Sequence, residues 1–240
     1  MTPVVFVHGF MGGGAQWAGQ RQAFAGAPVV TLDLPGFGAG ADLAPLDSIT
    51  AYARWVLQTL EAQGITRFHL VGHSMGGMIA QQMVAQAAER VDRLVLYGTG
   101  AKGVLPGRFE PIETSKERAR TEGAQATARR IAATWFLQRD AAPAYEACAQ
   151  IAEQSRIEAI LAGLDAMQHW DGGADLAALS QQTLVVWGDR DRTYTWAQTE
   201  HLWHAIARAS LAVIPGSAHA SHLERPALFN TIVSEFLLGD

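Results

Sequence analysis

The sequence is poor in cysteine, in charged residues and in long apolar runs. One cysteine, Cys148, cannot form a disulfide within the chain or a thiolate metal site, which favours a reducing compartment. Charged residues make up 17% of the chain, the net charge is -5, and no basic stretch could neutralise a phosphate backbone. Nucleic acid is therefore not expected as a partner. No window approaches the roughly 20 apolar residues that span a bilayer, and the first residues lack the basic start of a secretory signal. We expect a cytoplasmic protein that does not enter a membrane.

The 240 residues do contain enough apolar side chain, 49% of the composition, to bury a sizeable core. Short β-branched runs alternate with helical patterns, which is typical of a parallel sheet assembled from strand–helix–strand units. Most runs are apolar on both faces, as in a sheet that helices cover on both sides. The predicted strands are Val4–Val7, Val29–Leu34, Phe68–Val71, Leu94–Tyr97, Thr183–Trp187 and Leu211–Ile214. The fold class is therefore α/β, with a mostly parallel central sheet flanked by helices.

Two helices are indicated clearly by their apolar spacing. One follows Ser48, a candidate N-cap, and ends before Gly64, with apolar residues at helical intervals over residues 49–60. The other begins near Pro226, which suits a first helical turn, and runs to Gly239. Both patterns place one apolar stripe against a core.

The alternation of strands and helices stops between about residues 101 and 179. Residues 124–138 and 144–164 have helical patterns, and no convincing strand lies among them. The polar residues 102–121, with several Gly and Pro, predict an entry loop and hinge. We interpret this stretch as a helical cap inserted into a single domain that spans residues 1–240.

A glycine-rich turn around Ser74 carries the strongest chemical signal. In FHLVGHSMGG, residues 68–77, an apolar strand runs into a serine that a helix follows at once. A serine on so tight a turn is held in a strained conformation with its hydroxyl exposed above the sheet. Gly72, Gly76 and Gly77 are needed because a Cβ there would collide with the neighbouring strand or helix. Without further evidence, the same pattern also fits a glycine-rich turn whose serine merely caps a helix.

Three further segments favour a catalytic site over a simple turn. His8-Gly9-Phe10 ends an early strand, where the Phe10 N–H can point to the same spot as the Met75 N–H and form an oxyanion hole. Residues 185–191, VVWGDRD, end a late strand with two acids at the edge where open α/β sheets place their sites. Residues 214–219, IPGSAH, end the next strand with a histidine. The chain order is Ser, Asp, His.

These motifs resemble the α/β-hydrolase superfamily over nearly the whole chain outside the cap. They are HGF (8–10), DLPGFG (33–38), GHSMGG (72–77), GDRD (188–191) and PGSAH (215–219) followed by HLERP (222–226). The cap, with its Thr134-Trp135-Phe136, resembles more loosely that of small carboxylesterases and enol-lactone hydrolases. The family pattern Gly-x-x-Asp selects Asp191 over Asp189 as the acid of the triad.

The resemblance implies a serine hydrolase that cleaves a carboxylic ester or lactone through an acyl-enzyme. Ser74 would be the nucleophile, His219 its base, and Asp191 the residue that holds the imidazole. The same triad also serves carbon–carbon hydrolysis, lyase or perhydrolase chemistry in relatives, and some relatives are receptors that bind a ligand with little turnover. The expected partner is a small ester or lactone. Oligomeric state is not indicated.

Other residues are candidates for lesser or different roles. His222 rivals His219, and Asp33 is expected to fix a turn rather than to catalyse. Residues 36–41 match a dinucleotide fingerprint, but no helix start follows them, and no cluster has zinc-ligand spacing, so we expect no cofactor and no metal. A mainly apolar pocket for an aryl or medium-chain acyl group is predicted from aromatic and sulfur side chains. Its candidate residues are Trp17, Trp135, Phe136, Met167, Trp170 and Trp196.

Overall fold

A parallel sheet of six strands lies at the centre of the computed structural model, which describes residues 1–104 and 110–239. The strands are β1 (Val4–Val7), β2 (Val29–Leu32), β3 (Phe68–His73), β4 (Val91–Tyr97), β5 (Gln182–Gly188) and β6 (Ala209–Ile214). Their order across the sheet is β2-β1-β3-β4-β5-β6, and every pairing is parallel. The predicted fold class and all six predicted strands are confirmed, with ends shifted by up to three residues.

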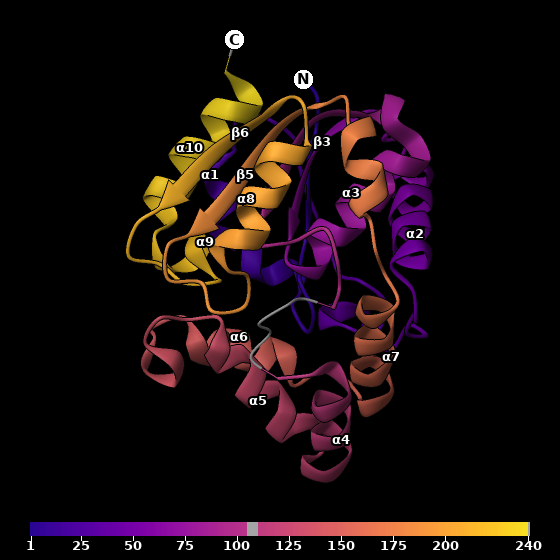
Figure 1. Cartoon of the computed structure of the whole chain (residues 1–240), viewed down its shortest axis with the longest axis vertical. Coiled ribbons are helices and arrows are strands. Elements are labelled where there is room, and N and C mark those ends of the chain that lie inside the picture. The colour runs from indigo at the N-terminus through magenta and orange to yellow at the C-terminus, as the bar shows by residue number, and fades with distance from the viewer. Residues whose placement is uncertain (105–109, 240) are drawn as a thin grey trace.

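Helices cover both faces of the sheet, because alternate strand residues point to opposite sides. Val5 and Val7 of β1 pack with α2 (Ile49–Ala62) and α3 (Met75–Ala87), whereas Val4 and Phe6 pack with residues of α10 (Pro226–Leu238) on the other face. The remaining helices around the sheet are α1 (Ala18–Ala23), α8 (Trp196–Ala205) and the short α9 (Ser221–Glu224). Figure 1 shows α1 and α10 on one side of the sheet and α2 and α3 on the other.

Helix α2 begins where the sequence indicates. The Ser48 hydroxyl accepts a hydrogen bond from the Ala51 N–H at 3.1 Å, which satisfies one of the free N–H groups of the first turn. The helix ends before Gly64, whose φ of +75° favours glycine.

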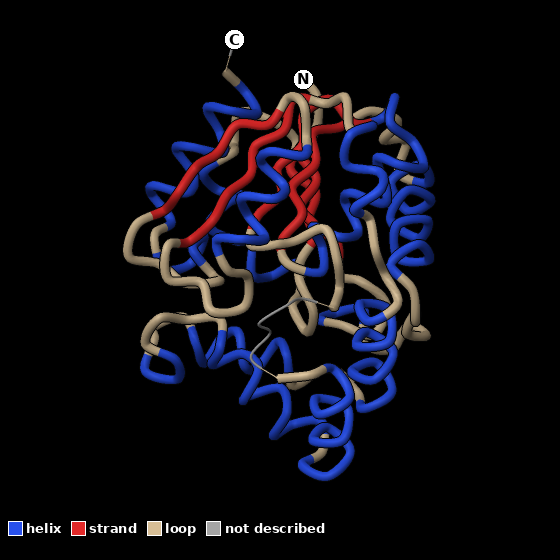
Figure 2. Tube along the Cα trace, viewed as in Figure 1, coloured by secondary structure: helices blue, strands red, loops and turns tan. Residues whose placement is uncertain are grey.

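Between β4 and β5, helices α4 (Ile112–Glu122), α5 (Ala124–Thr134), α6 (Tyr145–Ala152) and α7 (Ile157–Gln168) lie beyond the carboxyl ends of the strands (Figures 1 and 2). The prediction of a loop over residues 102–121 is wrong from Ile112 onward, because α4 forms there, and residues 105–109 of that loop lie outside the described residues. The helix predicted over 144–164 is two helices, interrupted at 153–156.

The two connections of this segment to the sheet run beside each other. Gly103 N–H donates to Trp170 O at 3.0 Å, and Gly172 N–H donates to Ala101 O at 2.9 Å. Buried residues of α5, α6 and α7 belong to the same hydrophobic core as α2 and α3. The part of the chain that the structure describes contains no helix long and apolar enough to cross a membrane.

Candidate active site

Ser74 lies between β3 and α3 in a strained backbone conformation. Its φ is +56° and its ψ is -121°, a combination that L-residues rarely adopt. The Ser74 N–H donates to Tyr97 O at 3.0 Å, and the Thr99 hydroxyl donates to Ser74 O at 2.7 Å. The end of β4 thus holds both backbone polar groups of the serine, which stabilises the turn against its strain.

Close backbone contacts explain the glycines around this serine. A Cβ on Gly76 would lie 2.3 Å from Val7 O, and a Cβ on Gly72 would lie 2.4 Å from Gly76 O. Such distances are impossible without moving the backbone. The predicted requirement for glycine is therefore confirmed at both positions, and it brings the first turn of α3 against the end of β1.

His219 and Asp191 form a buried pair at the ends of β6 and β5. The Nδ1–H of His219 donates to Asp191 Oδ2 at 2.8 Å, and their side chains are 2% and 0% exposed. The other carboxylate oxygen of Asp191 accepts hydrogen bonds from the N–H groups of Thr193 at 2.7 Å and Tyr194 at 3.2 Å. With Nδ1 held by the carboxylate, the Nε2 of His219 is the ring nitrogen available to a reacting group.

The backbone of His219 is positioned by two side chains from neighbouring strands. Its carbonyl accepts hydrogen bonds from the Tyr97 hydroxyl at 2.7 Å and from His73 Nε2 at 3.0 Å. Burial raises the pKa of Tyr97, and burial together with the nearby imidazoles of His219 and His222 holds the pKa of His73 well below its usual value. The sequence carries no signal for Tyr97, because it has the pattern of an ordinary buried strand residue.

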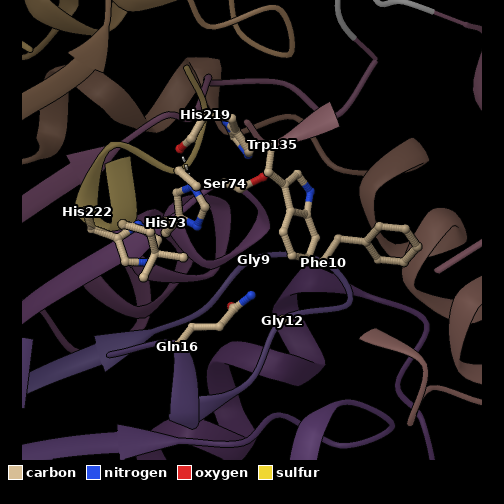
Figure 3. A pocket seen from close by; sticks show the side chains of 11 residues that line it. Gly9, Phe10, Gly12, Gln16, His73, Ser74, Trp135, His219 and His222 are labelled. Atoms are coloured by element: carbon tan, nitrogen blue, oxygen red, sulfur yellow. Dashed lines mark hydrogen bonds between the residues drawn. The ribbon is translucent and has the colours of Figure 1, made fainter. Parts of the chain in front are cut away.

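Ser74 and His219 line one narrow cavity that is partly open to solvent. Gly9, Phe10, Gln16, His73, Trp135 and His222 also line it. Figure 3 shows Ser74 between the His219 ring and the Trp135 indole, with the amide end of Gln16 directed toward the middle of the cavity from the opposite side.

The two predicted oxyanion donors come from backbone that flanks Ser74. A Cβ on Gly9 would lie 2.9 Å from the Ser74 Cβ, so the loop that carries Phe10 passes against the serine. Met75 is the first residue of α3, where an N–H has no acceptor within the helix. The oxyanion hole itself stays a prediction.

The rival candidates have structural partners elsewhere. Asp189 Oδ1 accepts a hydrogen bond from Gly216 N–H at 2.7 Å, which shapes the loop before His219. The Asp33 carboxylate accepts the N–H groups of Gly14 and Ala39, each at 3.0 Å, and so fixes a turn. His222 lies in α9, where its Nδ1 faces the Tyr97 hydroxyl at 3.3 Å, and it also lines the cavity.

Of the six aromatic and sulfur residues predicted for the pocket, Trp135 lines the cavity that contains Ser74. Trp17 instead packs against Phe6 on the α10 face of the sheet, and the Trp170 Nε1–H donates to Gln82 Oε1 at 3.2 Å. Phe136 and Met167 are buried in the core and Trp196 is 38% exposed. The sequence shows which residues are apolar but not which way each side chain points. Gln16, which lines the cavity, is a residue that the sequence analysis missed.

No cluster of three or more His, Cys, Asp or Glu side chains suited to a metal ion occurs within the described residues. The candidate dinucleotide loop, residues 36–41, contains the short 3-10 segment Gly38–Gly40, and the next α-helix, α2, begins only at Ile49.

The model of one protein family, described as the alpha/beta hydrolase fold, matches residues 2–226. The chain belongs to this family. A protein of Klebsiella pneumoniae (strain 342), provisionally named carbamate hydrolase RutD, is 30% identical over 98% of this chain and 90% of its own length. A 2-hydroxy-6-oxononadienedioate/2-hydroxy-6-oxononatrienedioate hydrolase of Burkholderia vietnamiensis (strain G4 / LMG 22486) is 30% identical over 98% of this chain and 86% of its own length.

Among solved structures, the enol-lactonase from Burkholderia xenovorans LB400 superposes with a TM-score of 0.89 at 26% identity, covering 98% of this chain and 91% of that one. The expected resemblance to the α/β-hydrolase superfamily, and to small esterases and lactonases within it, is therefore confirmed. These relatives include several hydrolases, and hydrolase activity of this chain follows at that level.

Proposed function

We propose that this chain is a serine hydrolase that cleaves a carboxylic ester or a lactone through an acyl-enzyme. The observation that carries the proposal is the 2.8 Å bond from His219 Nδ1 to Asp191 Oδ2, with that histidine and the strained Ser74 lining one cavity. An aliphatic hydroxyl needs a base to act as a nucleophile near neutral pH, and a buried carboxylate orients that base.

In the first half of the reaction, Ser74 Oγ attacks the carbonyl carbon of the substrate while His219 Nε2 takes the hydroxyl proton. The negative charge that develops on the carbonyl oxygen is stabilised by the N–H groups of Phe10 and Met75. Asp191 stabilises the imidazolium. His219 then gives its proton to the leaving alkoxide, and the acyl group stays on Ser74.

In the second half, a water molecule attacks the acyl carbon and gives a proton to His219. Collapse of the second tetrahedral intermediate returns that proton to Ser74 and releases the carboxylic acid. In this proposal the helices of residues 101–179 serve as a cap above the site, with Trp135 closing the cavity, and the protein acts in the cytoplasm.

Hydrolysis of a carbon–carbon bond is the second candidate. The relative from Burkholderia vietnamiensis, at 30% identity, carries the name of a 2-hydroxy-6-oxononadienedioate hydrolase, and the superposed enol-lactonase favours the ester or lactone reaction. Turnover of p-nitrophenyl esters against turnover of a vinylogous 1,5-diketone separates the two reactions.

A fluorophosphonate probe tests the nucleophile. We expect wild-type protein to be labelled on Ser74 and the Ser74→Ala variant to remain unlabelled, because the probe reacts with an activated serine. Ser217 and Ser221, buried and hydrogen-bonded to each other at 2.8 Å, offer a control, since Ser217→Ala is expected to keep the label. Labelling that survives in Ser74→Ala, or an absence of label in wild-type protein, would refute the proposed function. A ligand receptor without an activated serine would give the second result.

A further inference from the structure

Gln16 presents a hydrogen-bond donor to the cavity that contains Ser74. The residue is 8% exposed and lines that cavity. The Gly13 N–H donates to Gln16 Oε1 at 3.3 Å, which identifies the oxygen and turns the amide nitrogen toward the cavity (Figure 3). Gly12 leaves room for this orientation, because a Cβ there would lie 2.6 Å from the same oxygen.

The side-chain amide nitrogen of Gln16 has two N–H groups but only one weak hydrogen-bond acceptor near it. Its neighbour is the thiol of Cys148, whose pKa is raised by burial to about 11, so that the sulfur is uncharged and a weak acceptor. No other partner of this nitrogen is found among the residues that the structure describes. At least one N–H therefore remains for a group inside the cavity.

His222 lines the same cavity and has a buried ring nitrogen, Nε2, without a hydrogen-bond partner among the described residues. The Tyr97 hydroxyl has one proton and donates it to His219 O at 2.7 Å. Tyr97 Oη also accepts the His222 backbone N–H at 3.2 Å, and a second hydrogen bond to this oxygen, at its 3.3 Å contact with His222 Nδ1, needs the ring proton on Nδ1. His222 Nε2 therefore carries a lone pair. This nitrogen is buried without a hydrogen-bond partner among the described residues, and His222 as a whole is 2% exposed.

The imidazole of His222 keeps this lone pair at neutral pH. Burial lowers its pKa to about 3, and the ring packs against Trp17 with centroids 4.3 Å apart. A buried acceptor without a donor is costly, and so is a donor without an acceptor. The Gln16 amide thus has a free donor and His222 Nε2 is a free acceptor, and both residues line one cavity.

We propose that Gln16 and His222 form a polar subsite that recognises a hydroxyl group on the acyl part of the substrate. A hydroxyl can accept a hydrogen bond from the Gln16 amide and donate one to His222 Nε2, whereas a methylene can do neither. The preferred substrates are then short hydroxyacyl esters or hydroxylated lactones. This inference rests on the proposed function and names the substrate class of that same site. Both residues act as specificity-determining groups, separate from the triad.

Binding of the product acids to the Ser74→Ala variant tests the subsite without requiring turnover. Butyrate, 2-hydroxybutyrate and 3-hydroxybutyrate are compared by isothermal titration calorimetry. We expect one hydroxy acid to bind about tenfold more tightly than butyrate, the gain typical of a satisfied buried pair. Adding Gln16→Leu is expected to reduce this ratio to about twofold or less. Gln16→Glu, which can still accept the Gly13 N–H but lacks the amide N–H groups, should do the same and guards against misfolding of the leucine variant.

Gln20→Leu is the matched control. Gln20 is fully buried on α1 and its amide donates to His222 O at 3.1 Å, yet it does not line the cavity. The hydroxy acid preference should survive this change. Equal or undetectable binding of the hydroxy acids, or a preference that persists in both Gln16 variants, would overturn the subsite. Failure of the proposed hydrolase would instead appear as a wild-type Ser74 that the fluorophosphonate does not label.

Discussion

At the scale of single residues, the site depends on a serine held in a backbone conformation that L-residues rarely adopt. Ser74 has a φ of +56°, and its buried backbone groups are held by Tyr97 and Thr99 at the end of β4. Strain of this kind costs on the order of 1–3 kcal/mol and persists only where the surrounding structure enforces it. Here it directs the hydroxyl into the cavity.

Replacing this serine by glycine should therefore stabilise the fold while it removes the proposed nucleophile. We expect Ser74→Gly to be more stable than Ser74→Ala by about 1 kcal/mol, because glycine tolerates the positive φ, although it loses more entropy on folding. Urea unfolding of the two variants measures the difference. A glycine variant that is less stable than the alanine variant would show that the turn is not strained.

The two acids near the end of β5 should differ sharply when their charge is removed. Asp191→Asn leaves His219 Nδ1 without its carboxylate, and we expect the acylation rate to fall by about 10⁴. Asp189→Asn keeps an oxygen for the Gly216 N–H, so we expect a loss of less than about tenfold. The release of p-nitrophenol from an activated ester, followed in the first turnover, measures both. Similar losses would contradict the assignment of Asp191.

At the scale of elements, the site is assembled where the ends of β1, β3, β5 and β6 meet α3 and α9. These elements pack closely because glycines lie at the points of contact. On Gly188 of β5, a Cβ would lie 2.3 Å from Ala218 O, and so it would push away the loop that carries His219. Elements distant along the chain can thus bring their terminal residues into one cavity.

Two glycine-to-alanine substitutions should have opposite effects on stability. Gly76→Ala forces α3 away from Val7 O, and we expect a loss of about 2–3 kcal/mol in the free energy of unfolding. Gly19→Ala, in the exposed face of α1 with nothing within 4 Å of the added Cβ, should gain about 0.5–1 kcal/mol. Thermal or urea unfolding measures both, and a tolerated Gly76→Ala would mean that the two elements are less tightly apposed.

At the scale of the whole molecule, the interior contains several imidazoles that are neutral in the folded state. Burial lowers the pKa of His8, of His73 and of His222, the last to about 3. His8 is fixed by its contacts, because Leu34 N–H donates to Nε2 at 3.0 Å and the proton on Nδ1 faces Gly9 O at 2.8 Å. Their burial makes folding sensitive to acid.

Stability should fall as the pH is lowered from about 6.5. Unfolded imidazoles regain a pKa near 6.5 and bind protons that the folded state excludes, so each contributes a loss of up to about 1.4 kcal/mol per pH unit until its folded pKa is reached. Above pH 6.5 this contribution is complete and flat. Urea midpoints between pH 5 and 7.5 measure the slope. His222→Phe should make the slope shallower, and the exposed His201→Gln should leave it unchanged; a slope that does not respond to His222 would contradict this account.

The sequence by itself determined the order of the candidate catalytic residues along the chain: a serine, an acid and a histidine, each after an apolar run. It also showed glycines at positions where two backbone segments come into close contact. It did so because strand ends and tight turns depend on neighbouring residues. The tertiary structure alone decided that Tyr97 and His73 hold the carbonyl of His219, and that Gln16 rather than most of the cap aromatics lines the cavity. Those outcomes depend on the direction of side chains from segments more than a hundred residues apart, such as Tyr97 and His219, and no local pattern contains that information.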